Sequence, residues 1–565
     1  MKLAIDWGTS YTKIGYLKEG TLINLAGPYA SVPTAAAYND AVGLIFGSKA
    51  LRLRENTLTV PQFKLELKRN PNFFLGPVNM ESLLYEYFNF LLQNYIIPAG
   101  EPLESVTVGV PNYFGLNARR LLLDVLIRCF RVEKVELLPE PAAAAIGYNL
   151  NNEAPLQGEI LSIDIGGGTS DFSFISIAGR DDYTVESQFQ TGHDAFSGNE
   201  IDRAIVNNIL WPEFVISTGF NRSRFPFSDM SPRQTFLYNR MLQAAQNLKL
   251  ELGKQEEVYL NLPDFYESQS LQLVINRTAF LAQLRTVFDN LAAFIETSVK
   301  SRARHLGLLN NNKWDIDNVL LVGGASHTLG VCELLARSFS RVPLTLPCER
   351  EFNVLKGLCV WADRSSISSS VKTVYPFSFY IERFDSDSQS SVLEKIPFDF
   401  QNLRLDIKKR YRILTLNRDT PFNLSPDPEY FNLRIYEGDA ETANLSDRFS
   451  GRDLVMEISA PRSSLPDQIA ICLDLSRAKL ELEGGNPNIL INDDAGVFNR
   501  LRNTQIAWYN CLNQAKPNPG LMADYLGYLE NLQGNQTRPF SGHDKSTLFK
   551  LYALIDIMQK KKERK

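Results

Sequence analysis

The chain has 565 residues, a length at which one compact domain is not expected, because single hydrophobic cores rarely grow beyond about 300 residues. Hydrophobic residues make up 44% and charged residues 22%, the balance of an ordinary globular protein. The net charge of −5 argues against a general nucleic-acid binder, which usually carries a basic face. No apolar run approaches the roughly 20 residues of a membrane helix. Asp6 and Gly8 interrupt the first residues before the apolar core of a signal peptide could form. We therefore expect a cytoplasmic protein without nucleic-acid or membrane partners.

The first half of the chain contains one structural plan twice. Residues 3–6 are expected to form a strand that ends in a turn, and residues 12–17 its hairpin partner. Residues 160–165 and 171–177 repeat this plan around a second glycine-rich turn. The order of strand, acid, glycine turn, hydroxyl and strand therefore predicts two lobes that face one another across a cleft.

The second half begins with helical spacing and then changes character. Residues 235–252 and 276–305 are expected to be helices, and residues 319–322 form an apolar strand. A serine-rich stretch at 365–370 predicts a flexible linker and a domain boundary. Beyond it, strand-like segments alternate with turn residues up to about 482, and helical spacing returns at 497–513 and 544–562.

The two glycine turns carry the clearest chemical signal. Glycines let backbone N–H groups approach phosphate oxygens, and hydroxyl side chains add donors. An acid before each turn can hold magnesium through water, because magnesium keeps much of its hydration shell. Either turn alone could be an ordinary hairpin turn. Their recurrence favours a polyphosphate clamp made of Asp6-Trp7-Gly8-Thr9-Ser10-Tyr11 and Asp164-Ile165-Gly166-Gly167-Gly168-Thr169-Ser170-Asp171.

A third segment follows the strand at 319–322. Gly323 and Gly324 would let the backbone lie against a flat ring, either adenine or ribose. Taken alone, two glycines after a strand usually mark a turn. After the two phosphate turns, however, Gly323-Gly324-Ala325-Ser326-His327 would complete a nucleotide site.

The order of these segments resembles the superfamily of actin, sugar kinases and heat-shock ATPases, and most closely the seventy-kilodalton heat-shock chaperones. Val108–Phe114 is similar to the family's Val-Pro-Ala-Tyr-Phe segment, and Leu138–Ala145 to its Asn-Glu-Pro-Thr-Ala-Ala-Ala segment. The likeness covers residues 1–363 and extends more loosely to about 485. It implies an α/β two-lobed actin-like nucleotide-binding domain at 1–363, a linker at 364–374, a β-rich peptide-binding domain at 375–490 and a helical C-terminal region at 491–565.

The resemblance also implies roles for individual residues. Lys64 would be the catalytic cation that orients the γ-phosphate and the attacking water, although a lysine here could also be a surface residue. Asp6 and Asp164 would hold magnesium through water. Pro111 and Arg119 match a proline switch and an arginine relay between domains, and either could instead be purely structural. Further catalytic residues would be Glu140, Asp171 and Thr169, and the nucleotide would contact Gly8, Thr9, Ser10, Tyr11, Gly166, Gly167, Gly168, Thr169, Gln246, Lys249, Gly253, Gly323, Gly324, Ala325, Ser326 and His327.

The sequence departs from the family at the adenine pocket and the linker. Lys249 is kept, but the stacking arginine is replaced by Leu250 and the serine by Gly253. His327 stands where the family has a second arginine, so two guanidinium stacks on the base are lost. The linker is rich in serine where the family's is rich in leucine, which predicts weak coupling between the domains.

The expected function is that of an ATP-dependent chaperone-like protein that binds ATP with magnesium, hydrolyses it slowly and binds unfolded or extended polypeptide, with cochaperones as possible partners. A small-molecule kinase, an actin-like ATPase scaffold and an inactive ATPase remain alternatives. The β-rich region after residue 370 argues against a kinase or an actin-like filament, neither of which needs it.

Overall fold

The computed structural model describes residues 1–492 except 52–57, 70–72, 151–153, 180–181, 191–195, 219–231, 267, 365–369, 386–389, 401–402, 420–429, 440–451 and 484–489. Most of the predicted helical C-terminal region therefore lies outside the described residues. None of the described helices has the length and apolar character needed to cross a membrane.

The chain divides into two compact units. The first comprises Met1–Phe114, Leu122–Val374 and Arg404–Ile407. The second comprises Gly115–Leu121, Tyr375–Leu403 and Lys408–Lys565. The division into a nucleotide-binding and a peptide-binding domain remains a prediction about these units.

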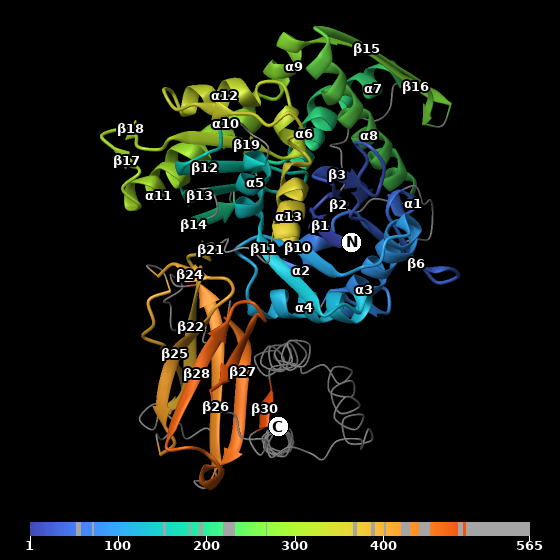
Figure 1. The fold of residues 1–565 in the computed structure, drawn as a ribbon. Helices are drawn as coiled ribbons and strands as arrows, with labels where there is room; N and C mark the ends of the chain where they lie inside the picture. Colours follow the sequence, from blue (N-terminus) through green and yellow to red (C-terminus); the bar gives the residue numbers. More distant parts are fainter. Residues whose placement is uncertain are drawn as a thin grey trace, which may run out of the picture. The chain divides into compact units, whose positions relative to one another are not determined.

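The first unit contains two sheets built on the same plan (Figure 1). In one, strands β1 (Lys2–Trp7) and β2 (Tyr11–Lys18) form an antiparallel hairpin, and β10 (Ser105–Val110) runs parallel to β1. In the other, β12 (Gly158–Ile165) and β13 (Ser170–Ala178) form the hairpin, and β19 (Asn318–Val322) runs parallel to β12. The duplicated hairpin expected from the sequence is thus present, and the unit is a mixed α/β structure.

Two helices lie in the core that the two sheets share. Helices α5 (Glu140–Asn149) and α13 (Asn353–Arg364) contact each other, and their side chains join buried residues of both sheets in one cluster. Glycine allows their close approach, since a Cβ built on Gly357 would lie 1.7 Å from the carbonyl oxygen of Ala143. The run of alanines at 142–145, buried in this cluster, presents the small side chains that such a crossing requires.

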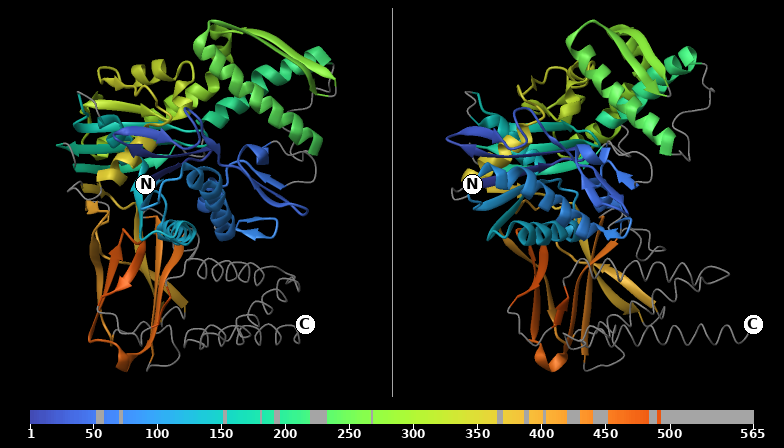
Figure 2. Two further views of the ribbon diagram at one scale, coloured as in Figure 1. Left: turned by 45° about the vertical axis from the view of Figure 1, so that its right-hand side comes forward. Right: turned by 90° about the vertical axis from the view of Figure 1, so that its right-hand side faces the viewer.

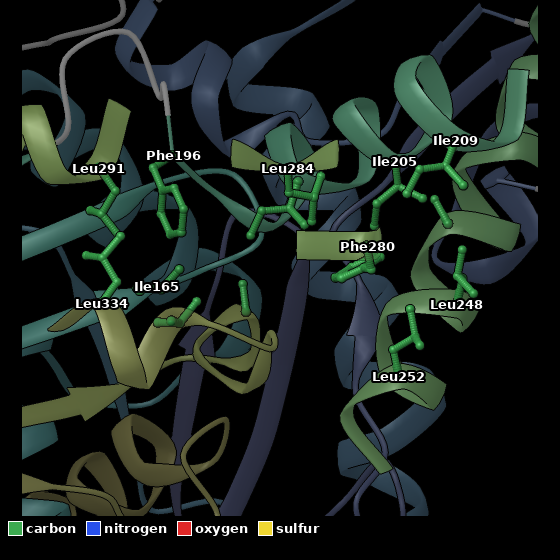
Figure 3. Close-up of a cluster of buried hydrophobic side chains, with 14 of the residues drawn as sticks. Ile165, Phe196, Ile205, Ile209, Leu248, Leu252, Phe280, Leu284, Leu291 and Leu334 are labelled. Atoms are coloured by element: carbon green, nitrogen blue, oxygen red, sulfur yellow. The ribbon is translucent and has the colours of Figure 1, made fainter. Parts of the chain in front are cut away.

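A second hydrophobic cluster extends from the other face of the β12–β13 sheet to the outer helices (Figure 3). The ribbon of this sheet and of these helices can be followed in Figure 2. Ile165 and Phe196 contribute from the sheet side, and Leu248 and Leu252 from α8 (Pro232–Lys254). These contacts hold α8 and α6 (Gly198–Ile205) against the sheet.

Further strands and α-helices of this unit are β3 (Thr21–Asn24), β4 (Val32–Pro33), β5 (Ala36–Asn39), β6 (Gly43–Phe46), α1 (Ser48–Leu51), β7 (Leu58–Val60), α2 (Lys64–Arg69), β8 (Phe74–Leu75), β9 (Val78–Asn79), α3 (Met80–Leu91), β11 (Lys134–Pro139), β14 (Asp182–Gln190), α7 (Trp211–Thr218), β15 (Glu257–Tyr266), β16 (Gln269–Asn276), α9 (Arg277–Gln283), α10 (Arg285–Phe294), α11 (Lys300–His305), β17 (Leu309–Asn310), β18 (Lys313–Trp314), α12 (Val331–Ser338) and β20 (Leu344–Thr345).

The end of the predicted linker is a strand of the first unit. Residues 365–369 lie outside the described part, but β21 (Ser370–Thr373) pairs in parallel with β14 and antiparallel with β24 (Leu405–Asp406). Val371 is fully buried in the cluster between the sheets. Asn112 donates a 2.8 Å hydrogen bond to the hydroxyl of Thr373. This part of the segment therefore has the apolar burial that its serine-rich composition did not suggest.

The second unit is built mainly of antiparallel strands, as its alternating pattern indicated. Its core residues alternate along the strands, with Ile381, Leu433 and Ile458 among those fully or almost fully buried. Arg434 forms ion pairs with Glu382 at 3.5 Å and Glu457 at 2.7 Å, and all three side chains are largely buried. One sheet has the order β23 (Ser390–Lys395), β22 (Phe377–Asp385), β26 (Tyr430–Asp439), β27 (Arg452–Pro461), β30 (Leu490–Asn492), and the other the order β25 (Arg410–Asn417), β28 (Gln468–Asp474), β29 (Lys479–Leu482).

Candidate functional site

Each hairpin places its acid and the residue opposite in a fixed register. In the first hairpin Asp6 pairs with Lys13 across β1 and β2. In the second, Asp164 pairs with Asp171 across β12 and β13. Lys13 therefore occupies in the first hairpin the position that an acid occupies in the second.

The two glycine turns lie against each other. A Cβ built on Gly167 would be 2.2 Å from Oγ and 2.5 Å from Cβ of Ser10, and one built on Gly168 would be 2.3 Å from Cγ2 of Thr9. Gln62 donates a 3.2 Å hydrogen bond to the Ser10 hydroxyl, next to this contact. The structure thus brings together the predicted phosphate residues of both turns, and only glycine fits on one side of the contact.

The third glycine segment meets the second turn and the acid before it. Gly323 has a φ of +87°, a left-handed conformation that favours glycine, and a Cβ there would lie 2.2 Å from Oδ1 of Asp164. Gly198, at the start of α6, has Ala325 and Gly167 as near neighbours. The segment at 323–325 therefore lies beside the second glycine turn, and its role in binding a nucleotide remains a prediction.

Lys64 is buried at this site, with only 5% of the residue exposed. Its Nζ forms an ion pair with Oε1 of Glu140 at 2.9 Å and lies 5.4 Å from the ring centroid of Trp7 and 5.8 Å from that of Phe114. The interpretation of Lys64 as a solvated surface lysine is therefore wrong. A buried ammonium held by one carboxylate and two rings has a defined position, as a catalytic cation requires.

The acids of the site are close enough to perturb one another. Burial, with the charges of Glu140 and Asp6, raises the pKa of the Asp164 carboxyl to about 7. Burial, with the charges of Glu140 and Asp164, raises the pKa of Asp171 well above its usual range. Thr169 donates a 3.0 Å hydrogen bond to Oδ2 of Asp171, whereas its buried Oδ1 has no hydrogen-bond partner. A cation near these groups would lower the repulsion among them.

These residues fit a magnesium ion held mainly through water. Asp6 and Asp164 supply the carboxylate oxygens that magnesium prefers, the Asp164 carboxylate occupies space that Gly323 leaves open, and Asp171 has an unpaired oxygen. Within the described residues, no group of three or more His, Cys, Asp or Glu side chains could bind a metal directly. An ion held by Asp6 and Asp164 through water would keep most of its water ligands, as magnesium prefers.

Lys13 belongs to the site although the sequence gave it no role. Its Nζ forms a 2.7 Å ion pair with Oδ2 of Asp6, and both side chains are largely buried. Burial lowers the pKa of Lys13, but attraction by Asp6, Asp164 and Glu351 outweighs this effect and raises it. The ammonium group is therefore charged. The sequence predicted the two strands of this hairpin but not their register, and the observed register, in which Asp6 faces Lys13, is the signal that identifies this lysine.

Two of the residues predicted to lie near adenine, Lys249 and His327, each contact an acidic side chain. Lys249 forms a 2.6 Å ion pair with Asp202, which also interacts with Gln246. His327 contacts Oε2 of Glu351 at 3.0 Å, and a Cβ on Gly253 would lie 4.0 Å from the carbonyl oxygen of His327. The structure therefore brings α8 and the segment at 324–327 together. The sequence had identified neither Asp202 nor Glu351 as a partner of these residues.

The two predicted coupling residues belong to different units. Pro111 is buried directly after β10 in the first unit. Arg119, on α4 (Leu116–Phe130), belongs to the second unit, where it is 7% exposed and interacts electrostatically with Tyr375. Their roles in coupling remain predictions.

Parts of the chain are similar in sequence to known proteins. Residues 93–350 match the family model described as Hsp70 protein. The chain is 27% identical over 270 residues to the chaperone protein DnaK of Carsonella ruddii (strain PV), which covers 47% of this chain and 42% of the relative. It is also 27% identical over 341 residues to the chaperone protein DnaK of Elusimicrobium minutum (strain Pei191), covering 58% of this chain and 51% of the relative.

The chain thus spans about half the length of the curated relatives that it matches. The matched family range contains the second glycine turn, Glu140 and the segment at 323–327. Asp6, Lys13 and Lys64 precede that range, so their assignment to the site depends on the geometry above.

Proposed function

Because residues 93–350 match the Hsp70 family model and the chain is similar to two DnaK chaperones, we propose that it is a divergent member of that family whose first unit binds ATP with magnesium and hydrolyses it slowly. The observation that carries this proposal is the contact between the two glycine turns beside buried Lys64. Backbone N–H groups from both turns would bind the phosphates, as glycine-rich turns do in other nucleotide sites.

Lys64 and Glu140 would act on the attacking water. The Lys64 ammonium, held in place by its 2.9 Å ion pair with Glu140, would stabilise charge on the transferred phosphoryl group. Glu140 and Asp171 would accept hydrogen bonds from the water and orient it. Asp6 and Asp164 would hold magnesium, which when bound supplies charge neutralisation for the phosphates.

Two measurements test this function. Calorimetry with ATP and magnesium should show binding, and the absence of binding at millimolar nucleotide would refute the proposal. Lys64→Met should reduce ATP turnover by roughly a hundredfold or more while leaving ATP binding largely intact, since positioned cations act mainly in the transition state. Lys18→Met is the matched control, because Lys18 is 57% exposed on β2 and pairs only with exposed Glu101 among the interactions described. Equal turnover in Lys64→Met and the wild type would remove Lys64 from the mechanism.

We further propose that the second unit binds extended polypeptide. Its antiparallel sheets provide strand edges and apolar side chains, which are the features that bind extended segments in other β-rich domains. Fluorescence anisotropy with a panel of labelled apolar peptides should show binding to the full chain, and a scrambled acidic peptide is the control. Failure of every apolar peptide would favour the alternative of an ATPase scaffold that contacts folded partners.

Pro111 and Arg119 would report the nucleotide state to the second unit. Arg119→Lys keeps the charge but loses the planar guanidinium group, so it should preserve ATP hydrolysis while reducing its stimulation by peptide. Unchanged stimulation would indicate that Arg119 has a purely structural role. A small-molecule kinase would instead phosphorylate an added acceptor, which an assay of ATP consumption with candidate sugars and polyols would detect.

A further inference from the structure

The proposed nucleotide site contains a lysine, Lys13, that faces Asp6 and has no role in the function proposed above. Lys13 and Asp171 occupy equivalent positions in the two duplicated hairpins, so the first hairpin has a positive charge where the second has a negative one. The Lys13 Nζ lies 2.7 Å from Oδ2 of Asp6, and only 15% of the lysine side chain and 8% of the aspartate side chain are exposed. Two strands of one sheet hold this pair, so its position is fixed by backbone hydrogen bonding.

Lys13 also interacts with acids outside its own hairpin. Its charge is attracted by Asp164, which belongs to the other sheet, and by Glu351, which precedes α13. Glu351 in turn contacts His327 at 3.0 Å. The Lys13 ammonium is therefore attracted by the two carboxylates that fit magnesium, Asp6 and Asp164. It is also attracted by Glu351, which lies next to the third glycine segment.

The charge balance shows what this lysine contributes. The carboxylates of Asp6, Asp164, Asp171 and Glu140 face the ammonium groups of Lys13 and Lys64. Without Lys13, Asp6 would lose its 2.7 Å ion pair, and the excess of negative charge would repel a polyphosphate. A divalent cation would then be the main means of neutralising the site.

We propose that Lys13 is a positioning residue that neutralises the acids of the phosphate site and thereby lowers the dependence of nucleotide binding on magnesium. The inference rests on the proposed nucleotide binding and adds a residue to that same site. It concerns the affinity for nucleotide with and without the metal, and no step of hydrolysis enters it.

The experiment measures the dissociation constant of ADP for the full chain by calorimetry, once with excess magnesium and once with excess chelator. The informative quantity is the dissociation constant measured with chelator divided by the one measured with magnesium. In Lys13→Met this ratio should rise roughly tenfold or more above that of the wild type, the scale of one charge interaction at a partly buried site. Lys13→Arg, which keeps the charge, should return the ratio towards the wild-type value.

Two further variants make the result specific. Lys13→Gln removes the charge but keeps a hydrogen-bond donor for Asp6, so it gives the same test if Lys13→Met fails to fold. Lys18→Met removes an exposed lysine from the same strand and should leave the ratio unchanged. A purely structural role for Lys13 would weaken ADP binding equally with and without magnesium.

The outcomes separate this inference from the proposed function. An equal ratio in the wild type and in both neutral variants would overturn the role of Lys13, while ADP binding itself would still support the proposed function. No ADP or ATP binding by the wild type under either condition would overturn both. A raised ratio in Lys13→Met and Lys13→Gln, reversed in Lys13→Arg, is the expected result.

Discussion

Replacing Gly167 by alanine tests directly whether the two glycine turns touch. The new Cβ would lie 2.5 Å from the Cβ of Ser10 and 2.2 Å from its Oγ. The hydroxyl can rotate away, but the Cβ of Ser10 cannot, and ordinary contact begins near 3.4 Å. The turns must therefore separate by roughly 1 Å, and overpacking of this kind costs about 1–3 kcal/mol.

A second substitution should relieve the clash. In Ser10→Gly the nearest remaining Ser10 atom is Cα, which would be 3.8 Å from the new Cβ, an ordinary contact. Ser10→Gly alone should cost about 0.5–1 kcal/mol through the greater backbone freedom of glycine in the unfolded chain. The double variant should therefore be more stable than the sum of the two single effects predicts, by about 1–3 kcal/mol.

The assay is denaturant unfolding of the full chain followed by tryptophan fluorescence. Four of the five tryptophans belong to the first unit, so the signal reports mainly on it: Trp7, Trp211, Trp314 and Trp361. Affinity for ADP should follow the same order, lowest in Gly167→Ala and restored in the double variant. Additive effects on stability, or an unperturbed Gly167→Ala variant, would show that the turns are not in contact and would refute the reasoning.

Three further substitutions have expected outcomes that unfolding experiments can check. Gly357→Ala should lower the unfolding temperature of the first unit by roughly 4 °C, because its Cβ would lie 1.7 Å from a carbonyl oxygen of α5 and overpacking costs about 3 kcal/mol; Gly253→Ala, which meets no atom closer than 4.0 Å, is the control and should not lower it. Arg434→Met should destabilise the second unit by about 3–5 kcal/mol, since it leaves buried Glu382 and Glu457 without their shared cation, and urea unfolding that shows no loss would contradict the network. Val371→Ser should destabilise the first unit by about 2 kcal/mol, as expected for a fully buried valine, whereas an unchanged midpoint would mean that β21 contributes nothing to the core.

The parts of the fold that the sequence predicted are local. An acid, a glycine turn and a hydroxyl between two apolar strands specify a hairpin from neighbouring residues alone, and this pattern identified both turns. The all-β character of the second unit followed from strand alternation in the same way. The family resemblance then supplied Lys64 and Glu140, which lie 76 positions apart and meet only in three dimensions.

The parts that the sequence did not predict depend on partners distant along the chain. Composition suggested a flexible linker at 365–370, and the resemblance extended it to 374, but β21 is stabilised by pairing with β14, almost 190 residues earlier. Asp202 and Glu351 were missed because their importance comes from Lys249 and His327, on other elements. Lys13 differs in that it lies close to Asp6 along the chain, but its partner depends on the register of the hairpin, which strand bounds alone do not determine.

The contact between the turns and the charges of the site constrain each other. Bringing Gly167 against Ser10 also brings Asp164 of one hairpin near Asp6 of the other, and these two carboxylates repel each other. Repulsion among these acids opposes the contact between the turns, and a cation beside them offsets it. Lys13 attracts Asp6 and Asp164 together, one from each hairpin, so its charge favours the closed contact in the same way that a bound cation would. Loss of the Lys13 charge should therefore weaken the steric coupling between Ser10 and Gly167 as well as alter the magnesium dependence, because both depend on the same approach of the two hairpins.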